Sequence, residues 1–137
     1  MSKASGRKWK DAGAVDMTEL AADTSTIRPD IPKEQWVSDV SHQEVPSPLG
    51  TIEYRITTRT ERCQETGQLC DFAVVLTETT HHLNTDVETH RVDTSDGTAH
   101  YHDPTGDHLI ELIPMDCRID IDKAFLWALD YIWAKSC

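Results

Sequence analysis

The sequence predicts a small α+β domain, an antiparallel β-meander of about five strands covered on one face by a C-terminal helix. Three observations support this fold class. Stretches in which polar and apolar residues alternate follow one another between residues 51 and 113, and such alternation is typical of half-buried strands. The stretches are joined by short connections that contain Gly, Pro, Asn and Asp, as antiparallel hairpins are. Residues 121–135 instead carry apolar side chains at helical spacing.

The chain of 137 residues has a length that fits one domain, and we assign this domain to residues 31–137. Residues 1–30 are predicted to form a flexible tail, because its first ten residues hold four basic and no acidic side chains among Ser, Ala and Gly. Within the tail, Asp16 and Glu19 have the spacing of a capping box. This spacing favours a short helix at residues 16–23.

Residues 31–50 lie between the tail and the first predicted strand. Asp30, two residues before Pro32, favours the start of a helical turn within residues 31–40. Two prolines and a glycine favour a loop at residues 41–50. We therefore expect the folded core to begin between residues 30 and 50.

Five strands are predicted, at residues 51–62, 69–80, 86–93, 98–102 and 108–113. The turn between the first two contains Gly67. A three-residue loop with Gly67 in the left-handed conformation would set Ile56 against Leu76. A two-residue loop would set Ile56 against Thr77, which packs worse, so we favour the three-residue loop.

The Asp-Gly pair at residues 96–97 predicts the next hairpin, because this dipeptide suits the tight turns of hairpins. With a two-residue loop, Asp93 would lie opposite His100. Arg91 would then lie opposite His102, whereas a four-residue loop would place Arg91 opposite His100. Either length leaves all four side chains on one face of the sheet, because side chains along a strand alternate with a period of two.

The other face of this hairpin is more apolar and carries His90, Val92, Ala99 and Tyr101. One face can therefore pack while the other collects polar groups. The next turn, residues 103–107, has Pro and Gly where a type I turn followed by a left-handed residue needs them. A three-residue loop there would pair His102 with His108 and bring His108 to the cluster.

The predicted sheet ends at Pro114, and Asp120 is expected to cap a helix that ends near Lys135. Its apolar stripe consists of Ile121, Ala124, Phe125, Ala128, Leu129 and Ile132. A lone antiparallel sheet needs one face covered, and this helix is the obvious cover.

The net charge of −11 comes from 24 acidic and 13 basic residues. Non-specific binding to nucleic acid depends on basic charge, so this balance disfavours RNA as a partner and accommodates a basic protein partner. No apolar run approaches the roughly 20 residues of a membrane span, and no apolar signal segment follows the basic N-terminal residues. We therefore expect a cytoplasmic protein that does not enter the membrane.

The candidate catalytic residues are Arg91, Asp93, His100 and His102. Histidine titrates near neutrality, carboxylates orient imidazoles, and arginine holds anions such as phosphate. One histidine could take the proton of a ribose 2′-hydroxyl while the other protonates the leaving oxygen. Arg91 could stabilise the charge that develops at phosphorus. This would be metal-independent ribonuclease chemistry, with no cofactor.

Two other interpretations stay open. His100 and His102, together with His108 or Asp93, could hold a divalent metal, because alternate residues of a strand point the same way. The cluster could also be a solvent-facing sheet surface without chemistry. The protein would then be a non-enzymatic interaction module whose exposed sheet edge and basic tail bind a protein partner.

Residues 91–102, Arg-Val-Asp-Thr-Ser-Asp-Gly-Thr-Ala-His-Tyr-His, resemble a short signature, Arg-aromatic-Asp followed by His-x-His, of small prokaryotic α+β domains. The TumE-type toxins of toxin–antitoxin pairs belong to that neighbourhood. The resemblance implies a protein encoded beside an antitoxin, with a nuclease-like activity. It extends to Arg91, Asp93, His100 and His102.

Overall fold

The computed structural model describes residues 26–46, 52–80, 83–106 and 109–136. The helix predicted at residues 16–23 and most of the predicted tail lie outside these residues. The elements in chain order are η1 (Lys33–Gln35), β1 (Trp36–Pro46), β2 (Ile52–Cys63), β3 (Leu69–Thr80), β4 (Thr85–Asp93), β5 (His100–His102), η3 (Ile110–Leu112), η4 (Met115–Cys117) and α2 (Ile121–Lys135).

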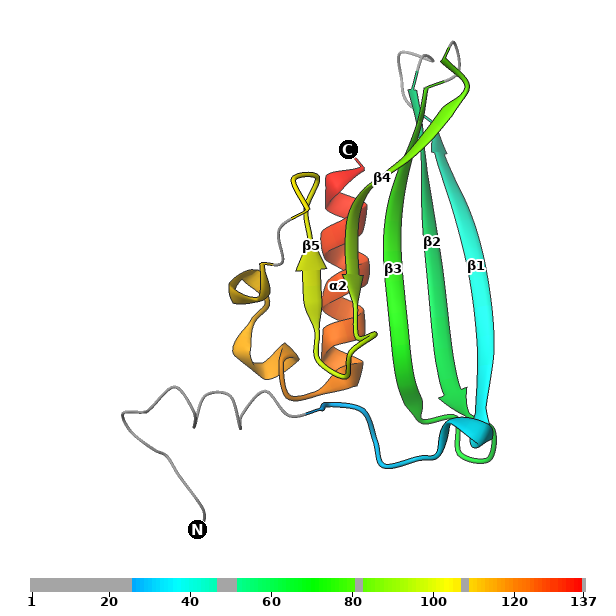
Figure 1. The fold of residues 1–137 in the computed structure, drawn as a ribbon, viewed down its shortest axis with the longest axis vertical. Coiled ribbons are helices and arrows are strands. Elements are labelled where there is room, and N and C mark those ends of the chain that lie inside the picture. Colours follow the sequence, from blue (N-terminus) through cyan, green and yellow to red (C-terminus); the bar gives the residue numbers. More distant parts are fainter. Residues whose placement is uncertain (1–25, 47–51, 81–82, 107–108, 137) are drawn as a thin grey trace.

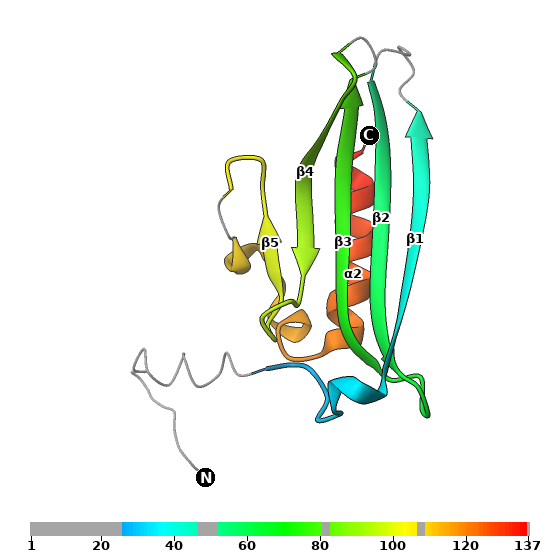
Figure 2. The same cartoon turned by 45° about the vertical axis from the view of Figure 1, so that its right-hand side comes forward.

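The strands form one antiparallel sheet in the order β1-β2-β3-β4-β5, and α2 packs on one face of it (Figure 1). The predicted α+β fold class is therefore confirmed. Figure 2 shows β1 and β5 at the two edges, with α2 behind the central part of the sheet. The contacts of α2 with the sheet are mainly to β3 and β4.

The edge strand β1 was not predicted. The expected helical turn is limited to η1, and residues 36–46, expected to be helical or loop, are a strand. The side chains from Val37 to Glu44 are all exposed, on both faces of the sheet. The strand therefore carries no apolar alternation that would reveal it in the sequence, and its backbone pairing with β2 holds it in place.

The strand predicted at residues 108–113 is absent from its described part, residues 109–113, so this prediction is wrong there. Residues 110–112 form the 3-10 turn η3, and the strand predicted at residues 98–102 is only the three-residue β5. The backbone N–H of Leu109 donates to the carbonyl of Tyr101 at 2.7 Å, and the chain then turns into η3. Ile113 is buried, which explains the apolar pattern of this segment without a strand.

The first hairpin has the predicted register. Ile56 lies opposite Leu76, and Gly67 is in the left-handed conformation with φ of 78°. A bulge between Glu61 and Arg62 shifts the pairing close to the turn, so the loop has four residues, 64–67, and the predicted three-residue loop is wrong. Matching of apolar side chains therefore decided the register of the long part of the hairpin.

The second hairpin has the register of the shorter loop. Asp93 lies opposite His100, and Arg91 lies opposite His102. The connection is nevertheless longer than two residues, because β5 begins only at His100. It contains a turn in which the N–H of Gly97 donates to the carbonyl of Thr94 at 2.8 Å, and Gly97 has φ of 95°.

The predicted type I turn at residues 103–107 is present in its described part. The N–H of Gly106 donates to the carbonyl of Asp103 at 2.9 Å, and Gly106 has φ of 89°. Residues 107 and 108 lie outside the described residues, so the predicted pairing of His102 with His108 stays a prediction.

The helix α2 begins and packs as predicted. The side chain of Asp120 accepts hydrogen bonds from the backbone N–H groups of Asp122 and Lys123, which caps the first turn. The fully buried side chains of α2 are Ile121, Ala124, Ala128 and Ile132. Phe125 extends the contact, with its ring centroid 5.2 Å from that of Phe72 on β3.

His90 lies on the helix side of β4, and its Nδ1 is 2.7 Å from the hydroxyl of Tyr101. Burial and the positive charge of Lys135 lower the pKa of His90, while Asp103 acts in the opposite direction. A lowered pKa in the folded state means that the unfolded chain binds the proton more readily. The free energy of unfolding should therefore fall as the pH drops below about 6.5, the ordinary value of histidine.

We expect the variant His90→Gln to have a flatter pH dependence of stability between about pH 6.5 and 5 than the wild type, because glutamine does not titrate there. Urea unfolding at several pH values measures this. If the free energy of unfolding of the two proteins changes equally with pH, the folded state does not lower the pKa of His90.

Candidate functional site

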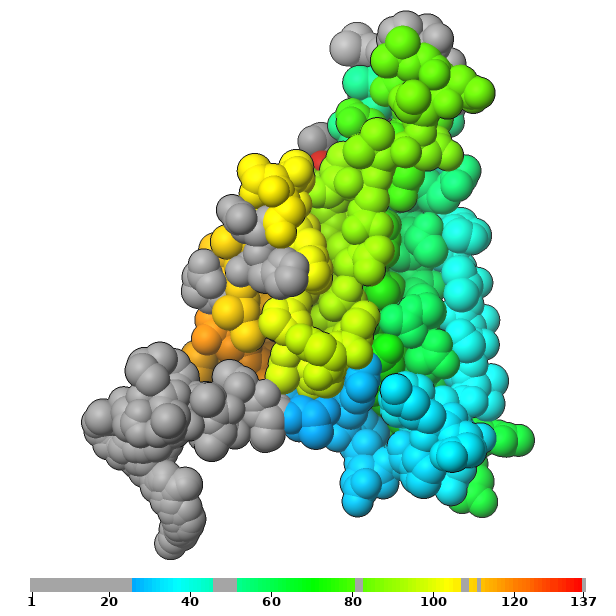
Figure 3. Space-filling model, in the orientation of Figure 1, coloured from blue at the N-terminus to red at the C-terminus, as the bar shows by residue number. Residues whose placement is uncertain are grey.

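The residues predicted for the site lie together on the sheet face opposite α2, which we call the open face. They are Arg91, Asp93, His100 and His102. Val92 and Tyr101 alternate with them along β4 and β5 and are buried in the core. The period of two therefore turns all four site residues outward. Figure 3 looks onto the open face, with α2 largely hidden behind the sheet.

A shallow pocket of about 280 Å³ lies on the open face. Its lining consists of Arg91, Asp93, Ser95, Asp96, His100 and His102. Ser95 and Asp96 belong to the turn between β4 and β5. The sequence marked Asp96 only as a turn residue, so its place in the pocket was missed.

The imidazole of His100 is held by two groups of this turn. Its Nε2 lies 2.6 Å from Oδ2 of Asp96 and 2.8 Å from Oγ1 of Thr98. Burial raises the pKa of Asp96, but hydrogen bonds from Thr98 and the nearby charge of His100 outweigh this, so the pKa of Asp96 is below its usual value. A carboxylate in this position orients an imidazole and stabilises the imidazolium when it forms.

The imidazole of His102 has a second carboxylate beside it. Its Nε2 lies 3.6 Å from Oδ2 of Asp93, whose side chain is only 6% exposed. Nη1 of Arg91 lies 3.5 Å from the same oxygen. The ring centroids of His100 and His102 are 6.3 Å apart. The pocket thus holds two imidazole–carboxylate pairs side by side.

Arg91 is held mainly by a carboxylate outside the pocket. Its Nε and Nη2 donate to the two carboxylate oxygens of Glu88 at 2.9 and 2.6 Å. The hydrogen bonds that Arg91 donates to Glu88 and the negative charge of Glu88 raise the pKa of Arg91 against the opposing effect of burial. The Glu88 side chain is 43% exposed, so water can solvate this carboxylate if Arg91 exchanges it for a bound anion.

A buried carboxylate, Asp71 of β3, is the centre of a network at the end of the open face. Its Oδ1 accepts hydrogen bonds from Oγ1 of Thr94 at 2.6 Å and from Nη2 of Arg28 at 3.1 Å. Its Oδ2 accepts a hydrogen bond from Nη2 of Arg59 at 3.2 Å. The same Nη2 of Arg28 donates to the carbonyls of Thr94 and Ser95. The network therefore fixes the turn that carries the pocket.

Sequence reasoning missed this network. Asp71 interrupts an otherwise apolar stretch of β3, and a lone carboxylate there was a signal of a buried ion pair. Arg28 comes from within the predicted tail of residues 1–30, and no local pattern links it to Asp71. The neighbouring residue Ile27 also contacts the fold, since its N–H donates to the carbonyl of Gly97 at 2.8 Å.

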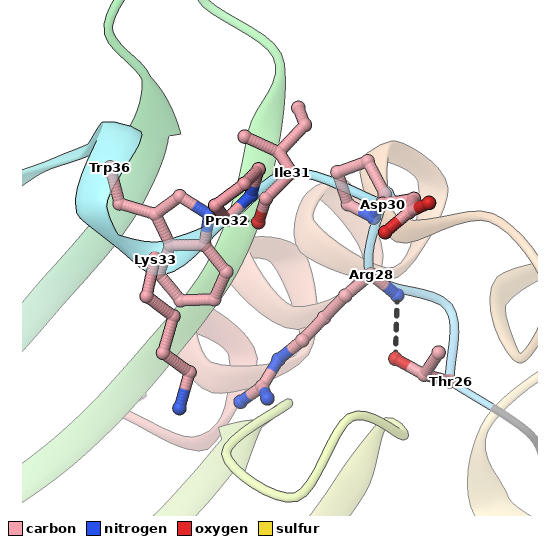
Figure 4. Close-up of a pocket in the computed structure, with 8 residues that line it drawn as sticks. Thr26, Arg28, Asp30, Ile31, Pro32, Lys33 and Trp36 are labelled. Carbon is pink, nitrogen blue, oxygen red and sulfur yellow. Dashed lines mark hydrogen bonds between the residues drawn. The ribbon is translucent and has the colours of Figure 1, made fainter.

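A second pocket, of about 470 Å³, lies beside this N-terminal segment (Figure 4). The cationic ends of Arg28 and Lys33 point the same way past the indole of Trp36, 5.6 and 5.8 Å from its centroid. Such cation–π contacts are weak at exposed positions. Because Arg28 already serves the Asp71 network, the pocket on the open face is the better candidate for chemistry.

The metal alternative has no support in the described part of the chain. There, no group of three or more His, Cys, Asp or Glu side chains is arranged to hold an ion. His108, a ligand in that alternative, lies outside the described residues. The described geometry of His100 and His102 is that of imidazoles beside carboxylates, which suits proton transfer.

Comparisons with known proteins give no assignment. No family model matches the sequence, no curated protein matches it, and no solved structure matches the fold. The resemblance of residues 91–102 to TumE-type toxins therefore stays a prediction. Within the described ranges, none of the helices has the length and apolar character that crossing a membrane requires.

Proposed function

We propose that the pocket on the open face is a general acid–base site for cleaving phosphodiesters, with RNA as the substrate class. One observation carries the proposal. Two imidazoles, each beside a carboxylate, lie 6.3 Å apart in one pocket. A phosphate would have to lie across both rings from the open face, because the rings are too close to flank a phosphorus. Nδ1 of His100 and Nε2 of His102 are buried. A phosphate oxygen would therefore reach His100 at Nε2, in exchange for the 61% exposed Asp96 side chain, and His102 at its other nitrogen.

In the proposed reaction, one neutral imidazole accepts the proton of the ribose 2′-hydroxyl, and the 2′-oxygen attacks the phosphorus. The bond from phosphorus to the 5′-oxygen breaks, and this oxygen takes a proton from the other imidazole, which starts as imidazolium. The products are a 2′,3′-cyclic phosphate and a free 5′-hydroxyl. The carboxylates of Asp96 and Asp93, 2.6 and 3.6 Å from Nε2 of His100 and His102, stabilise each ring by their negative charge when it is protonated.

Arg91 is the group proposed to bind the phosphate, by exchanging Glu88 for a phosphoryl oxygen. This exchange breaks the ion pair of Arg91 with Glu88, and the net charge of −11 repels a polyanion. We therefore expect weak binding of long RNA and a cleavage rate that increases when salt screens the repulsion. A basic protein partner, such as the antitoxin that the resemblance implies, would suit the same charge.

The proposal is tested with one oligonucleotide made as RNA and as DNA, each incubated with the full-length protein in EDTA. We expect cleavage of the RNA only, because the DNA lacks the attacking 2′-hydroxyl, and a cyclic phosphate on the 5′ fragment. Intact RNA, or equal cleavage of the RNA and the DNA oligonucleotide, would contradict the proposal.

A second candidate function is a protein-interaction module without enzymatic activity. The observation that favours it is the edge strand β1, whose side chains from Val37 to Glu44 are all exposed. The two functions do not exclude each other, because β1 and the pocket lie at different parts of the sheet. Substitutions in the pocket should abolish only RNA cleavage, and substitutions in β1 should abolish only partner binding.

A further inference from the structure

The outer edge of β1 is a long, open pairing surface. β1 has eleven residues, Trp36–Pro46, and is the first strand of the sheet, so no strand of the described chain pairs with its outer side. A strand at an edge presents unpaired N–H and C=O groups, and proteins usually protect such edges with Lys, Pro, bulges or a covering element. The eleven residues contain no Lys, and the only Pro is the last residue.

The side chains of β1 from Val37 to Glu44 are also exposed. Val37 and Val40 lie on opposite faces of the sheet, and each is 50% exposed. On the helix side, α2 packs on β3 and β4 and leaves the surface of β1 open. Two half-exposed valines on a long edge without lysine favour association through this edge.

We propose that β1 pairs with β1 of a second copy of the protein, antiparallel about a two-fold axis at Ser41, to give a continuous ten-stranded sheet. Only an axis at Ser41 lets all eleven residues of the strand pair, because Ser41 is its central residue. This proposal is independent of the proposed enzymatic function.

The side chains of β1 are self-complementary in this register. On the helix side, Val37 lies opposite Val45 of the second copy, twice in the dimer. Asp39 lies opposite Gln43, whose side-chain amide can donate to it, and Glu44 lies opposite the uncharged Ser38. No two like charges are opposite each other, which is the condition that cross-strand pairs require.

The first test is the mass of the full-length protein in solution by light scattering, over a range of concentrations. We expect twice the chain mass of 15.5 kDa. The variant Val37→Lys should be monomeric, because it places lysine in the centre of an apolar contact. The control is Val87→Lys on β4, where the valine is 53% exposed, and it should remain dimeric. A monomeric wild type, or a dimer that only Val87→Lys disrupts, would overturn the proposal.

The second test locates the two-fold axis. It uses variants that should still fold and dimerise. The two copies of residue 41 would have Cα atoms about 4.5–5.5 Å apart, within the range of a disulfide. In a Cys137→Ser background, Ser41→Cys should form a covalent dimer on oxidation with diamide. Ser38→Cys should not, because the two copies of residue 38 would lie six residues apart along the pair. Equal cross-linking of both variants, or none, would reject the register.

Discussion

Replacing His102 with alanine is expected to lower the turnover number for RNA cleavage by about 100-fold or more, because positioned acid–base groups contribute roughly 10²–10⁴-fold. His102 lies on the open face next to Asp93 and 6.3 Å from His100. Its side chain is 27% exposed, so removal of the ring leaves little unfilled space in the core. The variant should therefore fold normally and fail in catalysis.

The matched control is His42→Ala. His42 is also a histidine on the open face, but it belongs to β1, where its Nδ1 lies 2.9 Å from Oγ1 of Thr57. This variant should keep the wild-type turnover number. Thermal melts of both variants would test whether unfolding, and not the loss of the imidazole, lowers the turnover number. If His102→Ala and His42→Ala cleave RNA equally well, the site does not use His102.

Replacing Asp71 with alanine is expected to lower the free energy of unfolding by about 3 kcal/mol, the lower end of the range for breaking a buried ion pair. The reason is that Arg28 and Arg59 would both lose a carboxylate partner while remaining 18% and 30% exposed. The hydroxyl of Thr94 would lose its acceptor at 2.6 Å. Urea unfolding followed by circular dichroism measures the change.

The control for Asp71→Ala is Asp130→Ala, which removes an exposed aspartate of α2, away from β1. Substitutions at exposed positions usually change stability by less than about 0.5 kcal/mol. A loss below about 1 kcal/mol for Asp71→Ala would mean that the network does not hold the turn, and that the two arginines find other partners.

The fold was predictable where the sequence pattern is local. The register of Ile56 with Leu76 follows from apolar matching, and the start of α2 follows from the capping side chain of Asp120. β1 was not predictable, because its exposed side chains show no alternation and its pairing is made by the backbone. At residues 108–113 the apolar pattern predicted a strand that the described residues do not form. Ile113 is apolar because it is buried in the core.

The site was predictable to the extent that it depends on the period of a strand. Arg91, Asp93, His100 and His102 face one side for any loop of even length, so the uncertain turn did not matter. Asp96 reaches His100 only because the turn has a particular shape. The bond from Arg28 to Asp71 spans 43 positions in the sequence, so no local pattern identifies Arg28 as the partner of that carboxylate.

The most direct test of a shared two-histidine site compares His100→Ala, His102→Ala and the double variant in single-turnover cleavage of RNA. Groups that act as a unit are non-additive, so the double variant should be about as slow as the slower single variant. Losses that multiply in the double variant, or single variants that cleave like the wild type, would contradict a site in which one imidazole removes a proton while the other supplies one.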